Sequence, residues 1–91
     1  MAAITVQSES GDRYLVVVED GGSSSQHRVT AGPEQVADLG GDVAAEELIE
    51  ASFEFLLERE PKESILPEFE LPVIAQYFPD YPAAIRRRLS G

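Results

Sequence analysis

The chain has 91 residues, of which 43% are hydrophobic, contains no cysteine and carries a formal net charge of −10. This length fits one domain, the missing cysteines exclude disulfides and thiolate chemistry, and the negative charge makes direct nucleic-acid binding unexpected because it repels phosphate backbones. No apolar run approaches the roughly 18 residues of a membrane-spanning helix, and no charged-then-apolar leader opens the chain, so we expect a cytoplasmic protein without membrane association.

Residues 1–31 are expected to form a three-stranded antiparallel β-meander. Ile4 and Val6 alternate with polar residues, which is typical of a strand with one buried face. After a turn at 10–12, the run RYLVVVED at 13–20 is apolar on both faces. A strand of this kind is usually central in a sheet or covered on both sides.

The next residues predict a loop, a strand and a short helix, each from its composition. The run of glycine and serine at 20–25 predicts a mobile hairpin loop, and QHRVT at 26–30 predicts a short third strand. Residues 32–41 predict a short helix, because Pro33 is tolerated in a first turn and the pair Gly40-Gly41 can end it.

The strongest predicted helix is DVAAEELIEASFEFLLERE at 42–60. Its apolar residues cover an arc of roughly 200°, given the 3.6-residue period, so this central helix should pack against neighbours on two sides. Asp42 is the expected N-cap, because its side chain can accept a hydrogen bond from an unpaired amide. The helix should end before Pro61, since the residue before a proline disfavours helical geometry.

The remaining residues predict short, punctuated pieces. Ser64 can cap a brief turn at 65–66. Leu71-Pro72 opens a short helix that should point Tyr77 inward. Asp80 is the expected cap of a last helix.

The expected fold is therefore α+β, a three-stranded antiparallel β-meander followed by a central amphipathic helix and two or three short helices. The whole chain, 1–91, should form a single domain. Within it, the meander occupies 1–31, the short helix and glycine turn 32–41, and the helical part 42–91.

Four glutamates recur at every fourth position of the central helix and form an acidic stripe: Glu46, Glu50, Glu54 and Glu58. Like charges at this spacing cost an isolated helix roughly 0.2–0.5 kcal/mol per pair, which is small enough to need no functional reason. The acidic stripe is therefore either a solvated face or a docking surface for a basic protein partner. Carboxylates along a straight stripe do not converge on one cation, so we expect no metal site.

Three arginines, Arg86, Arg87 and Arg88, lie in the last turns of the final predicted helix. Cations there complement the negative end of the helix dipole and add solubility. Alternatively, this basic end meets the acidic stripe, either within the chain or in a neighbouring copy. Arg59 falls inside the apolar arc, where it can lay its stem on apolar surface or pair with a carboxylate.

The run QYFPDYP at 76–82 holds three aromatic residues and two prolines. The prolines fix the backbone between two short helices, so the run can be a rigid corner packed on the central helix. The other interpretation is a partner-binding patch built from exposed Tyr77, Phe78 or Tyr81.

His27 is the single histidine, and a general base needs an orienting partner together with a nucleophile or water within reach. The serines at 23–25 are near in sequence, but a flexible loop holds a nucleophile poorly. The chain has no H-E-x-x-H, G-x-S-x-G, P-loop or G-x-G-x-x-G motif. We therefore expect no catalytic residues and no cofactor.

The chain resembles a group of small acidic bacterial proteins of unknown function through SFEFLLEREPKESIL at 52–66, followed by Phe69, Leu71, Ile74, YFPDY at 77–81 and Ile85. The resemblance covers the chain from about residue 47 to residue 89. It implies a free-standing cytoplasmic protein and supplies no activity, cofactor or catalytic residue.

The function expected from the sequence is a non-catalytic protein–protein interaction module that uses the acidic stripe and the aromatic corner. One alternative is a self-associating structural subunit, in which the arginines of one copy meet the glutamates of another or open strand edges pair. The other alternative is a small-ligand-binding protein or enzyme with His27 near a pocket.

Overall fold

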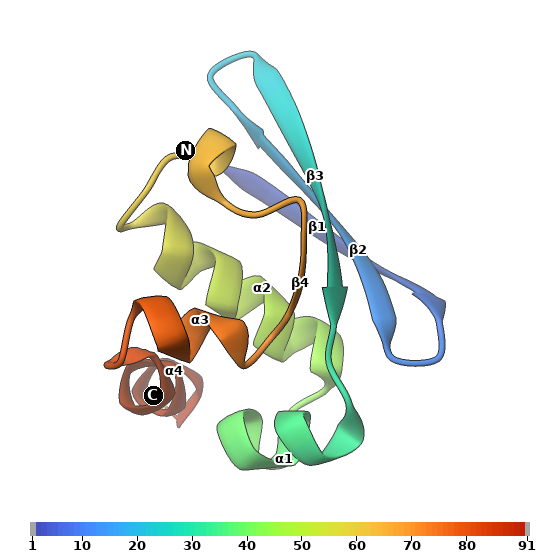
Figure 1. Cartoon of the computed structure of the whole chain (residues 1–91), viewed down its shortest axis with the longest axis vertical. Coiled ribbons are helices and arrows are strands. Elements are labelled where there is room, and N and C mark those ends of the chain that lie inside the picture. The colour runs from blue at the N-terminus through green and yellow to red at the C-terminus, as the bar shows by residue number, and fades with distance from the viewer. Residues whose placement is uncertain (1, 91) are drawn as a thin grey trace.

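The computed structural model describes residues 2–90 and has an α+β fold (Figure 1). Its four-stranded sheet has the order β1-β2-β3-β4, with three antiparallel strands and a parallel fourth. The elements, in chain order, are β1 (Ala3–Ser10), β2 (Arg13–Asp20), β3 (Ser23–Thr30), α1 (Pro33–Gly40), α2 (Ala45–Leu57), the 3₁₀ helix η1 (Lys62–Ser64), β4 (Glu68–Glu70), α3 (Val73–Tyr77) and α4 (Tyr81–Ser90).

The β-meander predicted from the sequence is present, but its second hairpin differs from the prediction. Gly21 and Gly22 alone close the turn, both with positive φ (64° and 83°), as two-residue hairpins require. The serines at 23–25 therefore belong to β3 and pair with residues 18–20 of β2. The expected mobile loop at 20–25 is wrong because two glycines are enough to reverse the chain.

The fourth strand was not expected. β4 runs parallel to β3, with Val29 opposite Phe69 and Thr30 opposite Glu70. The chain between these strands contains α1, α2 and η1, so the pairing is set by tertiary packing and has no local sequence signal. The prediction that Ser64 caps a turn at 65–66 is also wrong. Ser64 is the last residue of η1, and Pro61 precedes that helix.

The central helix α2 confirms the strongest helix predicted, although it is shorter at both ends. Asp42 is not its N-cap, because Asp42 lies inside the turn that begins at the glycine pair. This turn is closed by a hydrogen bond from the Val43 N–H to the Gly40 carbonyl (3.4 Å). The first extended residue before the helix is Ala44, so Ala44 takes the N-cap position. Glu58 is the C-cap.

The helices lie on one side of the sheet (Figure 1). α2 packs against β1 on one flank and against α1 and α4 on others, as its wide apolar arc indicated. The side chains that are completely buried between these layers include Val16, Val18, Val29, Leu48, Ile49, Phe53, Phe55, Leu71, Tyr81 and Ile85. On the opposite face of β2, Leu15 and Val17 are only half-buried, so this strand is central in the sheet but covered on one side.

Candidate functional site

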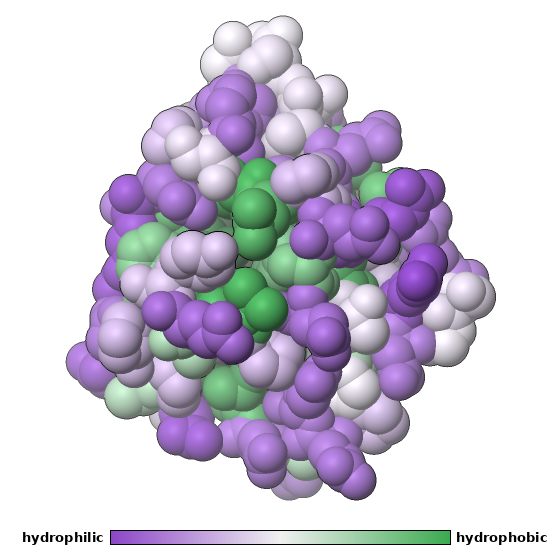
Figure 2. All heavy atoms as spheres, viewed as in Figure 1, coloured by the Kyte–Doolittle hydropathy of each residue, from purple (hydrophilic) through white to green (hydrophobic). Residues whose placement is uncertain are grey.

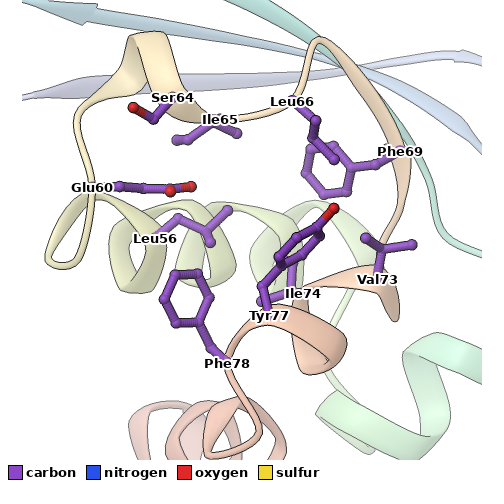
Figure 3. A pocket seen from close by; sticks show the side chains of 10 residues that line it. All are labelled: Leu56, Glu60, Ser64, Ile65, Leu66, Phe69, Val73, Ile74, Tyr77 and Phe78. Carbon is purple, nitrogen blue, oxygen red and sulfur yellow. The ribbon is translucent and has the colours of Figure 1, made fainter.

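An apolar hollow of about 240 Å³ lies where three segments of the chain meet (Figure 3). The end of α2 forms its floor, the segment from η1 to β4 forms one wall, and α3 forms the other. The lining residues are Leu56, Glu60, Ser64, Ile65, Leu66, Phe69, Val73, Ile74, Tyr77 and Phe78. Apart from Glu60, Ser64 and the Tyr77 hydroxyl, these side chains are hydrocarbon.

Leu66 and Tyr77 stand at the rim of the hollow. They are the two large hydrophobic residues that are exposed in the part of the chain described, at 42% and 65%. Figure 3 shows Tyr77 rising from α3 towards Phe69, and Glu60 pointing into the hollow from the turn that follows α2. An apolar area ringed by hydrophilic residues occupies the centre of the same face in Figure 2. Exposed apolar residues gathered in one place mark an interaction site more often than scattered ones do.

The wall at 62–67 is tied to the sheet at two points. At one end, the buried Lys62 ammonium donates to the Asp20 carbonyl at 3.1 Å and to the Glu63 carboxylate at 2.7 Å. At the other end, His27 Nδ1 lies 2.8 Å from the Leu66 carbonyl oxygen. Both anchors are on the β2–β3 hairpin, so the hairpin fixes the position of this wall.

The two hydrogen bonds of His27 define its tautomer. A carbonyl oxygen only accepts, so Nδ1 carries the proton and donates to Leu66. Nε2 then accepts from the Ser25 hydroxyl at 2.8 Å. His27 is 2% exposed, and its ring lies 5.3 Å from that of Phe53. Neither Ser25 nor His27 lines the hollow, so the Ser–His pair serves to hold the wall in place.

The opposite wall rests on an aromatic corner around Phe55. Phe78 meets the Phe55 ring edge-on at 6.0 Å, and Tyr81 lies 5.3 Å from the same ring. The Arg59 guanidinium sits 3.7 Å from the centre of the Phe55 ring and pairs with Asp80 at 2.7 Å. This stack accounts for Arg59 within the apolar arc, because the cation covers an aromatic face while reaching a carboxylate.

The structure separates the three aromatic residues that were proposed together as a patch. Tyr81 is completely buried, and its hydroxyl lies 2.6 Å from Ser52 Oγ, so its assignment to a partner-binding patch is wrong. Phe78 is half-buried and lines the hollow. Tyr77 was expected to point inward but is exposed at the rim, because α3 is only five residues long and turns Ile74 into the core instead.

The acidic stripe is divided by an arginine of α4. Arg88 lies 2.8 Å from the Glu58 carboxylate and 3.8 Å from that of Glu54, so the charge of the C-terminal half of the stripe is partly compensated within the chain. The hydrogen bond from Arg88 lowers the pKa of Glu58 below its ordinary value. Glu46 and Glu50 are exposed, and no described residue forms an ion pair with them.

The other two arginines of α4 have different surroundings. Arg86 donates to the Asp38 carbonyl at 2.9 Å and so ties α4 to α1. Arg87 is exposed in the last turn of the helix. No three acidic or histidine residues between 2 and 90 are arranged to hold a metal ion.

Comparison of the chain with protein-family models, with curated proteins and with solved structures finds no match. Between residues 2 and 90, none of the helices combines the length and apolar content needed to cross a membrane.

Sequence reasoning identified Tyr77 and Phe78 but missed the opposite side of the hollow, where Leu66 and Phe69 lie. One signal for Leu66 was available. Ile65 and Leu66 are adjacent apolar residues in a segment that Pro67 keeps from being helical. Adjacent side chains of an extended segment point to opposite sides, so one of the two had to face outward.

Proposed function

We propose that this protein is a non-catalytic, cytoplasmic protein-interaction module, and that the apolar hollow is its docking surface. The observation that carries the proposal is the position of Leu66 and Tyr77. These two exposed large hydrophobic residues belong to segments far apart in sequence, yet both line the same hollow. Tyrosine is enriched at interfaces because it offers a large rigid ring with a polar tip.

The size of the hollow favours a side chain of a protein over a free small molecule. Sites for drug-sized ligands usually enclose roughly 300–1,000 Å³, whereas this hollow has about 240 Å³. A single large apolar side chain, presented by a partner, fits such a space. The hydrophilic residues that ring the apolar area in Figure 2 supply the polar border that interfaces commonly have.

The acidic residues contribute a preference for basic partners. Glu60 lines the hollow, and Glu46 and Glu50 remain exposed on the stripe. They are part of the net charge of −10, which steers a basic protein towards the surface without holding it.

The proposal is tested by affinity capture from the lysate of the cells that make the protein, with quantitative mass spectrometry. The double variant Leu66→Ser/Tyr77→Ser should lose a protein that the unmodified chain captures, because it removes both rim residues. Gln76→Ser, an exposed neighbour, is the matched control and should retain that protein. The purified partner should then bind the double variant roughly 30-fold more weakly, as for an interface hot spot. A set of captured proteins that is the same for all three chains contradicts the proposal.

Self-association is a second candidate, favoured by one observation. β1 is an edge strand of eight residues, so its outer backbone groups are open to pairing with another strand. Sedimentation at low and high salt over a range of concentrations decides this: a dimer that forms through β1 should persist in salt, and a monomer throughout removes the candidate.

A further inference from the structure

The open edge of β4 borders the hollow. Among residues 2–90, β4 is the last strand of the sheet and pairs only with β3. The Pro67 carbonyl accepts from the Arg28 N–H at 2.8 Å, and the Leu71 N–H donates to the Thr30 carbonyl at 2.9 Å. Residues 67, 69 and 71 therefore direct their backbone groups towards β3. The N–H and C=O groups of residues 68 and 70 point the other way, to the open edge.

The side chains of β4 divide between two environments. Phe69 is nearly buried, lies 6.0 Å from the Phe53 ring and lines the hollow. Glu68 and Glu70 are exposed and lie on the other face of the sheet. A strand added beside β4 places the residue opposite Phe69 on the same face, beside the hollow, and places its two neighbours beside the glutamates.

We propose that the partner docks by adding an extended segment as a fifth strand on β4, with a large apolar residue in the hollow and a Lys or Arg on each side of it. This inference rests on the proposed function and specifies the chemistry of its partner. The two basic residues face Glu68 and Glu70 across the new strand pair, and opposite charges in that position stabilise pairing. Backbone hydrogen bonds give affinity and the hollow gives selectivity, as in other cases of strand addition.

The two glutamates also explain why this edge stays unpaired with other strands. Short, charged edge strands discourage pairing. A glutamate directly opposite a neutral residue gains no electrostatic stabilisation, and one opposite an acidic residue is repelled. The chain's own open strand, β1 (AITVQSES), contains no Lys or Arg, so a second copy offers no matching segment from that edge. A basic–apolar–basic segment of another protein is the occupant that the charges select.

The test uses the full chain and three fluorescein-labelled nine-residue peptides that share a Ser/Thr background and differ at the centre. The probe has Lys-Phe-Lys, one control has Glu-Phe-Glu, and the other has Lys-Ser-Lys. Fluorescence anisotropy should show binding of the probe, with both controls at least roughly tenfold weaker, because each lacks one of the two required features. Amide hydrogen exchange at Glu68 and Glu70 should slow on binding of the probe.

Two further measurements separate strand addition from simple occupation of the hollow. In an added strand, every second backbone amide of the probe faces β4. N-methylation of these amides should abolish binding, whereas N-methylation of the other amides should leave binding unchanged. The double variant Glu68→Lys/Glu70→Lys should exchange the preference, binding Glu-Phe-Glu and rejecting Lys-Phe-Lys. Glu34→Lys/Glu47→Lys makes the same change in net charge at two exposed positions outside the proposed docking surface, and should keep the original preference.

Several outcomes overturn the proposal. Equal binding of all three peptides, equal effects of the two methylation patterns, or unchanged exchange at 68 and 70 each exclude strand addition. A dimer that protects the same two amides without peptide shows that a second copy is the occupant. If the peptides fail while capture still depends on Leu66 and Tyr77, this inference falls and the proposed function stands; if that capture also fails, both fall.

Discussion

His27 Nδ1 donates a hydrogen bond of 2.8 Å to the carbonyl oxygen of Leu66, 39 residues further along the chain. This bond joins the middle of the sheet to the rim of the hollow. Together with the bond from Lys62 to Asp20, it holds a segment that has little regular structure of its own. The shape of the candidate site thus depends on a buried histidine that does not line it.

Replacing His27 by phenylalanine should lower the free energy of unfolding by about 2 kcal/mol. Phenylalanine keeps an aromatic ring, somewhat larger than the imidazole, but the Leu66 carbonyl and the Ser25 hydroxyl lose their partner in a partly buried place. Urea denaturation measures the loss, and amide exchange should quicken at 66–69. Ser25→Ala, which removes only one of the two bonds, should cost about 1 kcal/mol. Equal losses for the two variants would show that the bond to Leu66 adds nothing.

Stability should fall between about pH 10 and pH 12 because of Tyr81. Burial raises the pKa of Tyr81 to about 12, whereas tyrosine in the unfolded chain titrates near 10. The contribution is complete below pH 10 and is lost as the pH rises through the folded-state pKa, since only the unfolded chain ionises in this window. The loss is on the order of 2 kcal/mol.

The matched variant for this effect is Tyr81→Phe. Ser52 keeps its bond to the Leu48 carbonyl (2.7 Å), so the variant should cost only about 1 kcal/mol at neutral pH. Its stability should fall less than that of the unmodified chain between pH 10 and pH 12, as measured by urea denaturation at each pH. Parallel curves for the two chains exclude the assigned role of Tyr81.

Arg88→Gln should raise the pKa of Glu58 towards its ordinary value, because the hydrogen bond from Arg88 is the main cause of its depression. The stabilising effect of this pair is present above the ordinary carboxyl pKa and is lost as the pH falls through the lowered one. NMR titration of the Glu58 carboxyl carbon measures the shift. Arg87→Gln removes a neighbouring exposed charge and should leave the Glu58 titration where it was. A Glu58 pKa shift of the same size in both variants would show that the net charge of the helix, and not the pair with Arg88, lowers this pKa.

Gly22→Val should destabilise the protein by about 1–2 kcal/mol, since φ is 83° at this position and a branched side chain clashes with its own backbone there. Gly22→Asn should cost less, because asparagine tolerates positive φ. Thermal denaturation followed by circular dichroism distinguishes them. Similar losses for valine and asparagine contradict a two-residue turn that requires positive φ.

The local elements could be predicted where a pattern repeats within one segment. Alternation at Ile4 and Val6 identified β1, the wide apolar arc at 42–60 identified α2, and the prolines and glycines marked most boundaries. Boundaries failed where two local signals competed. Asp42 is a good capping residue, but the glycine pair before it extends the turn and moves the cap to Ala44.

Features built from distant segments could not be predicted in this way. β4 is three residues long, and its pairing to β3 leaves no periodic signature at Glu68–Glu70. The sequence presents Tyr77 and Tyr81 as equivalent aromatics, whereas α4 packs Tyr81 against Ser52 and leaves Tyr77 outside. The hollow combines three segments, so its existence follows from packing that only the structure shows.

The central claim is that the hollow is where a protein partner docks, and photo-cross-linking at its rim tests this most directly. Benzoylphenylalanine is placed at Tyr77 in one chain and at Gln7, an exposed position of β1, in another. Irradiation in lysate should join the first chain to a partner at high yield, with the link next to an apolar residue flanked by Lys or Arg. Equal or lower yield at Tyr77 than at Gln7 would contradict the assignment of the hollow as the docking surface.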